Sequence, residues 1–248
     1  MPKTYFEYRG VSNAVYAEIT SDTAEEFVTG AVKDLTGVSE IGKTTESAHE
    51  VHFYDNIAAI VVDSVGADEI TINTSGIPLD VLADITGQFY DEENGMLVEQ
   101  EPTPKYFAFG YITDKTDGTK VLVWRLKGKF SIPGTTSATK DDGTDANGQE
   151  LTYTGISTIY KFMRTGKQSS AINVDTSVNK ITTAESFFAE VNTPDTILPI
   201  ILATDDDAII VTSEDFEILV RRKEIEQWTT QREEESLISR RPQKWETT

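Results

Sequence analysis

The fold class is decided by two alternating runs, Tyr106-Phe107-Ala108-Phe109-Gly110-Tyr111-Ile112 and Val121-Leu122-Val123-Trp124-Arg125-Leu126-Lys127-Gly128-Lys129-Phe130. Asp117-Gly118 lies between them, and an Asp-Gly pair between two β-prone runs favours a hairpin. The stretch therefore predicts two paired strands. No set of catalytic residues accompanies it, so we expect the protein to work through its surfaces.

Further strand-like segments make a mainly β protein the expected fold class. Apolar and polar residues alternate from Val11 to Ile19, as in a half-buried strand. Other candidate strands are 31–41, 49–62, 69–73 and 151–163. Tyr54-Asp55-Asn56 interrupts the candidate at 49–62 and indicates a bulge or a turn.

Two short helices are expected beside the strands. Pro78 is tolerated in a first helical turn, and apolar residues then recur at helical spacing until Gly87. The second helix covers 183–191, begins with Thr183 as its cap and stops before Pro194. Asp91-Glu92-Glu93-Asn94-Gly95 is typical of a turn.

Composition limits the classes of partner. Forty-two Asp and Glu against 22 Lys and Arg give the 248-residue chain a net charge of −20, which argues against a protein that grips the phosphate backbone. An acidic wall past which DNA slides is compatible with this charge, and so is an acidic surface that only aids solubility. There is no cysteine, hence no disulfide. No apolar run reaches the length of a membrane span, and we expect synthesis in the cytoplasm.

The motifs that suggest chemistry are incomplete. His49-Glu50-Val51-His52 has its histidines three residues apart in a strand-like run, whereas the zinc-protease motif needs them four apart on a helix. The segment 142–148 is similar to a calcium loop but lacks both essential carboxylates when its glycine is aligned. We therefore expect no enzyme, no metal and no cofactor.

The order of the segments resembles the major tail protein (tail tube protein) family of long, non-contractile phage tails, over roughly residues 5–195. The matching landmarks, in order, are Val11-Ser12-Asn13 with 17–23, Tyr54-Asp55-Asn56, the helix ending near Gly87, Asp91 to Gly95, Pro104 to Gly110, and Leu126-Lys127-Gly128-Lys129-Phe130. The resemblance implies a β-sandwich or barrel-like subunit with flanking helices. It also implies hexameric rings that stack into a tube through which the genome passes.

The resemblance sets further expectations. Lumen candidates are the acidic residues that flank probable strands: Asp63, Asp68 and Glu69. The loop 135–149 has no large apolar residue and could bridge to neighbouring subunits. Its candidate assembly residues are Thr135, Asp141, Asp142, Asp145 and Asn147. Expected partners are further copies of the chain, a tape-measure protein, a tail terminator and distal tail proteins. The expected location is the virion tail, assembled in the host cytoplasm.

Two organisational questions stay open at this point. Residues 1–195 are expected to form the tube domain, while 196–248 form either an outer decoration or an arm between rings. The alternatives to a non-contractile tail tube are the inner tube of a contractile tail or injection particle, and a surface β-sandwich that binds carbohydrate. In the last case Tyr106, Tyr111 and Trp124 would stack on sugars, although aromatic residues in alternating strands more often pack in a core.

Overall fold

The structure is a computed structural model that describes residues 5–135, 148–179 and 182–197, and these residues are mainly β. The elements are β1 Tyr8–Asp22, β2 Phe27–Thr29, β3 Lys33–Asp34, β4 Val38–Tyr54, β5 Ile57–Thr74, α1 Leu79–Thr86, β6 Phe89–Asp91, β7 Met96–Val98, β8 Phe107–Lys115, β9 Lys120–Phe130, β10 Gln149–Gly155, β11 Ala171–Asp175 and α2 Ala184–Ala189. The expected fold class, mainly β with two short helices, is confirmed.

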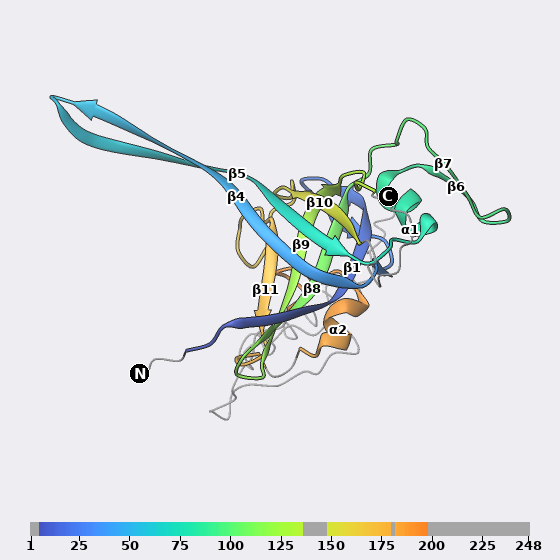
Figure 1. The fold of residues 1–248 in the computed structure, drawn as a ribbon. Helices are drawn as coiled ribbons and strands as arrows, with labels where there is room; N and C mark the ends of the chain where they lie inside the picture. The colour runs from blue at the N-terminus through green and yellow to red at the C-terminus, as the bar shows by residue number, and fades with distance from the viewer. Residues whose placement is uncertain (1–4, 136–147, 180–181, 198–248) are drawn as a thin grey trace, which may run out of the picture. The chain divides into compact units, whose positions relative to one another are not determined.

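One large antiparallel sheet organises the described residues. Its strand order is β2-β1-β8-β9-β10-β5-β4, with β11 beside β9 and β3 beside β1, while β6 and β7 form a separate pair. Figure 1 shows β4 and β5 crossing in front of β8 and β9, so the sheet curls over one of its own faces. The predicted central hairpin is present as β8 and β9, and Gly118 in its turn has a φ of 83°.

One face of the β8–β9 hairpin packs against α2. Trp124 is fully buried, its Nε1 donates a hydrogen bond to the carbonyl oxygen of Phe187 at 3.0 Å, and its ring lies 5.5 Å from that of Phe188. Leu122 and Leu126 belong to the same cluster. The Thr183 cap predicted from the sequence begins this helix, because the hydroxyl accepts the amide of Ser186.

The opposite face of the hairpin packs against the curled part of the sheet. Its cluster joins β8 and β9 to β5 and β10 and includes Phe107, Phe109, Phe130, Tyr153, Ile70 and Ile72. The hydroxyl of Tyr153 donates to the carbonyl oxygen of Phe107 at 2.9 Å, which satisfies the buried polar end of that side chain. The central hairpin is thus covered on both faces.

The segment that the sequence interrupts at Tyr54-Asp55-Asn56 is a hairpin turn. Asp55 and Asn56 both adopt left-handed backbone conformations, with φ of 51° and 61°, as a two-residue turn between right-twisted strands requires. The candidates at 49–62 and 69–73 are therefore parts of one hairpin, β4 and β5, whose strands have 17 and 18 residues. Helix α1 ends at Gly87 as expected, with a φ of 70°.

Two strand predictions need correction, and four strands, β2, β6, β7 and β11, were missed. The candidate at 151–163 ends as a strand at Gly155, because the amides of Ile159 and Tyr160 bind the carboxylate of Asp22 in place of a neighbouring strand. The candidate at 31–41 divides into β3 and the start of β4. The strands β2, β6 and β7 have three residues each, too few to show alternation.

We expect Gly128→Ala to lower the free energy of unfolding by about 2 kcal/mol through overpacking. A Cβ at Gly128 would lie 2.4 Å from the backbone oxygen of Thr154 and 2.4 Å from the ring of Tyr153. Gly42→Ala is the matched control, since a Cβ at Gly42 meets nothing within 4 Å. Urea denaturation measures both variants, and equal midpoints for the two would contradict the packing described here.

Candidate functional site

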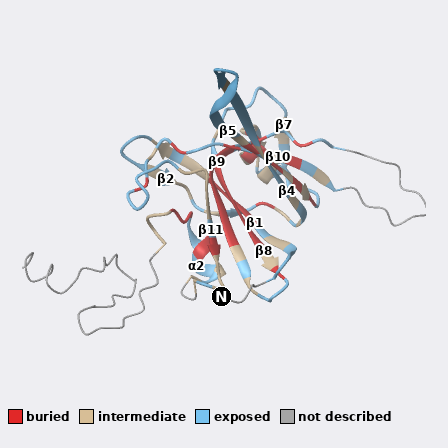
Figure 2. Cartoon of the chain, turned by 90° about the vertical axis from the view of Figure 1, so that its left-hand side faces the viewer, coloured by how far each residue is buried: buried red, intermediate tan, exposed pale blue. Residues whose placement is uncertain are grey.

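The outer part of the β4–β5 hairpin projects from the rest of the described chain. We call residues 46–66 the outer hairpin, and all of them are exposed except the partly exposed His52. Phe53, Ile57 and Val65 are 66%, 68% and 77% exposed. Figure 1 shows the two strands leaving the body together, with no other described element beside them, and Figure 2 shows this hairpin coloured as exposed.

Both faces of the outer hairpin carry apolar side chains. The strand register places Val51 opposite Val61 and Ser47 opposite Val65, and Phe53 follows on the same face. The same face carries Ile70 and Ile72 nearer the body, where they are fully buried. The other face carries Tyr54, Ile57, Ile60 and Val62. A two-stranded ribbon is marginal in water, and apolar patches of this kind mark contact surfaces.

The charge of the outer hairpin is entirely negative. It contains Glu46, Glu50, Asp55 and Asp63 but no Lys or Arg. His49 Nδ1 lies 2.7 Å from a carboxylate oxygen of Asp63. The hairpin therefore suits a partner surface that offers positive charge or hydrogen-bond donors together with apolar contact.

Asp68 anchors the root of the hairpin to the body. Its carboxylate accepts a hydrogen bond from Thr45 at 2.6 Å and lies 3.1 Å from Lys43 Nζ and 3.3 Å from Arg125 Nη1. Burial by itself raises the pKa of Asp68, but the hydrogen bonds from Thr45 and Lys43 and the charges of Lys43 and Arg125 outweigh it and hold the pKa below its usual value.

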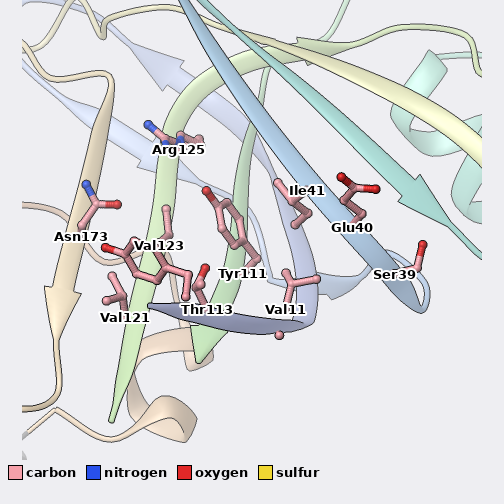
Figure 3. A pocket seen from close by; sticks show the side chains of 12 residues that line it. Val11, Ser39, Glu40, Ile41, Tyr111, Thr113, Val121, Val123, Arg125 and Asn173 are labelled. Carbon is pink, nitrogen blue, oxygen red and sulfur yellow. The ribbon is translucent and has the colours of Figure 1, made fainter. Parts of the chain in front are cut away.

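A pocket of about 650 Å³ opens beside this anchor. Figure 3 shows residues of β1, β4, β8, β9 and β11 around it. Its apolar walls include Val11, Ile41, Val121 and Val123. Arg125 also lines the pocket and is 7% exposed, and its Nε is the one buried side-chain nitrogen or oxygen in the described part of the chain without a hydrogen-bond partner.

The structure separates the residues predicted for the lumen. Asp63 is exposed on the outer hairpin, Glu69 is exposed on the opposite side of β5 from Asp68, and Asp68 is buried and paired. Burial of Asp68 counts against a lumen role for it, while the role of the other two stays a prediction. Thr135 is exposed, and the remaining candidates of the loop 135–149, Asp141, Asp142, Asp145 and Asn147, lie outside the described residues, as do residues 198–248.

The three aromatic residues considered for carbohydrate stacking form no common platform. Trp124 is fully buried against α2, whereas Tyr111 belongs to the cluster on the opposite face of the sheet. Tyr106 is 39% exposed, and Lys127 and Lys129 lie over its ring. Among the described residues, no group of three or more His, Cys, Asp or Glu is placed to hold a metal ion.

Sequence reasoning recognised the hairpin only in part and missed the pocket. The turn at Asp55-Asn56 was the available signal for the hairpin, together with the apolar residues on either side of it. The pocket had no such signal, because its residues come from five strands. Comparison with known proteins adds no assignment: no protein-family model matches the chain, and no curated protein matches it either. In the described part, no helix has the length and apolar character needed to cross a membrane.

We expect Asp68→Asn to destabilise the protein at pH 7 by about 3 kcal/mol, because Arg125 then stays buried without its charge partner. The pKa of Asp68 is lower in the folded than in the unfolded chain. The contribution of its ionised form is therefore complete above the unfolded value of about 3.9, and it is lost as the pH falls through the folded value.

Urea unfolding at pH 7 and at decreasing pH tests this expectation. The difference from the wild type should shrink in acid. Glu69→Gln, at the exposed neighbouring position, is the matched control and should change the free energy of unfolding by less than about 0.5 kcal/mol at pH 7. A difference for Asp68→Asn that does not depend on pH would show that the ion pair is not its cause.

Proposed function

We propose that this protein is the structural subunit of a phage tail tube, which polymerises as hexameric rings stacked around a channel for DNA. The observation that carries the proposal is the outer hairpin, residues 46–66, which is apolar on both faces and has no described part of its own chain to cover it. The order of sequence landmarks shared with the tail tube family gives the proposal its particular form.

The geometry of the hairpin supports a polymer better than a closed pair. If the outer hairpin packs on a different surface of a second copy, that copy presents its own hairpin to a third. Such a heterologous contact produces rings when its rotation closes, and filaments when it does not. A tube of stacked rings combines both arrangements, because each ring is closed and the stack of rings is an open filament. An isologous dimer, in which two hairpins cover each other, would stop at two copies and would leave no hairpin for a third.

The acidic composition suits a channel that DNA passes without adhesion. The net charge of −20 leaves few places where a phosphate backbone could bind, and the exposed Asp63 and Glu69 remain the lumen candidates. A tape-measure protein, a tail terminator and distal tail proteins would complete the tail. The subunit would assemble in the host cytoplasm and reside in the virion.

Two alternative functions predict different binding partners. The inner tube of a contractile tail or injection particle would use the same contact between copies and would co-purify with a sheath protein. A surface protein that binds carbohydrate would stay monomeric and bind glycans. The separated positions of Tyr106, Tyr111 and Trp124 give that second alternative no support.

We expect the double substitution Val51→Thr and Val61→Thr to raise the concentration at which the protein assembles by roughly thirtyfold. Each substitution removes about 1 kcal/mol of apolar burial from the contact between copies. The two valines are 43% and 59% exposed and pair across the hairpin, so the isolated subunit should keep its stability. Analytical ultracentrifugation and electron microscopy measure assembly, and urea unfolding measures stability.

The control is Val178→Thr, since Val178 is 70% exposed and lies outside the hairpin. This variant should assemble like the wild type. Equal assembly of the double variant and the control would refute the role of the hairpin. A wild-type protein that stays monomeric at high concentration, with tail partners present, would refute the proposed function itself.

A further inference from the structure

We propose that the pocket beside Arg125 is a carboxylate-binding site and that its ligand is Asp55 at the hairpin tip of a second copy of this chain. This inference rests on the proposed self-association and names its two contact surfaces. The pocket is lined by Arg125, Tyr111, Thr113 and Asn173 together with apolar side chains (Figure 3).

The pocket has an unused donor in a buried position. Arg125 is 7% exposed, and its only described ion pair joins Nη1 to Asp68, while Nε has no partner. A buried donor without an acceptor costs free energy, and a guanidinium favours a carboxylate as its acceptor. The two cations at this place, Lys43 and Arg125, share the single carboxylate of Asp68. The pocket lining itself holds one cation, Arg125, and one carboxylate, Glu40, which accepts a hydrogen bond from Asn73 Nδ2 at 3.3 Å. The Nε donor of Arg125 is therefore the group at this place that lacks an acceptor.

The walls of the pocket lie on the half of the central hairpin nearer its turn. Strands β5 and β10 cover the inner half of β8 and β9, and β9 then pairs with β11 over residues 121–125. The pocket-lining side chains of this half are Tyr111 and Val123, which are buried, and Thr113 and Val121, which are partly exposed. A ligand for this pocket needs apolar surface around its carboxylate.

The tip of the outer hairpin has the matching chemistry. Asp55 occupies the two-residue turn with Asn56 and is exposed, and its side chain makes no hydrogen bond or ion pair with any described residue. Tyr54 and Ile57 flank the turn and are 59% and 68% exposed. The tip thus presents one free carboxylate between two apolar side chains.

The tip cannot reach the pocket of its own chain. The outer hairpin runs for about ten residues from Thr45 to Asp55, which at about 3.3 Å per residue places the tip roughly 30 Å from the root. The pocket lies at the other side of that root, beside Glu40 and Ile41 of the same strand. The tip of one copy is therefore available only to another copy.

The first test compares two hairpin carboxylates in the full-length protein. We expect Asp55→Asn to weaken self-association by about tenfold to a hundredfold, because it removes a charged hydrogen bond. Asparagine tolerates the left-handed backbone at this position, so the turn itself should persist. Asp63→Asn is the matched control and should leave self-association within about threefold of the wild type. An effect of Asp63→Asn alone, or equal effects of the two, would overturn the assignment of Asp55.

The second test locates the contact by cross-linking. The chain has no cysteine, so copies with Ile57→Cys can be mixed with copies with Thr113→Cys and oxidised. We expect disulfide-linked mixed dimers, and far fewer when Val178→Cys replaces Thr113→Cys. Tubes that form without this cross-link would overturn the inference and leave the proposed function standing. A cross-link without rings or tubes would support the inference and refute the proposed function, and the absence of both would refute both.

Discussion

The rest of the structure depends on one constraint: a two-stranded ribbon with apolar side chains on both faces cannot satisfy itself in water. The body resolves the same problem for its central hairpin, because α2 covers one face of β8 and β9 and the curled sheet covers the other. The outer hairpin has the same two-sided character without either cover. Its strand edges also offer unpaired backbone groups. In the proposed function, a second copy supplies what it lacks.

The body is built to hold this ribbon in a fixed direction. Lys43 and Thr45 of β4 and Arg125 of β9 all converge on Asp68, so the root is fixed to the central hairpin by charge as well as by the apolar packing of Ile70. A bulge between Thr45 and Ser47 follows directly. Bulges change the local twist and direct what lies beyond them. A rigid root loses less entropy on assembly than a flexible one.

The sequence revealed those features that depend on residues close to one another along the chain. Asp117-Gly118 predicted the central turn, and Thr183 and Gly87 predicted helix ends, because turns and caps are local. The long hairpin was recognised only in parts. Its outer strands are apolar on both faces and contain bulges, so the simple alternation of a half-buried strand is lost.

The anchor and the pocket could not be derived in the same way. Asp68 was named as a lumen candidate because it flanks a probable strand, whereas the structure buries it beside Arg125, 57 positions away in the chain. Arg125 itself lies in β9, a strand that was predicted from the sequence. Whether its side chain is paired, however, depends on β5, which carries Asp68 and reaches β9 through β10 only after folding.

Charge explains how a protein with such a ribbon could avoid indiscriminate association. With a net charge of −20, two copies repel each other at distances where only their overall charge acts. The acidic outer hairpin adds to this repulsion when it approaches most of another copy's surface. In the proposed self-association, a place that combines apolar contact with a buried guanidinium N–H lacking an acceptor would reverse the balance at short range. Specificity of the proposed contact would then come from repulsion everywhere else as much as from attraction at the pocket. The same division of long-range and short-range forces would let the ribbon remain exposed until the correct surface of a sister subunit meets it.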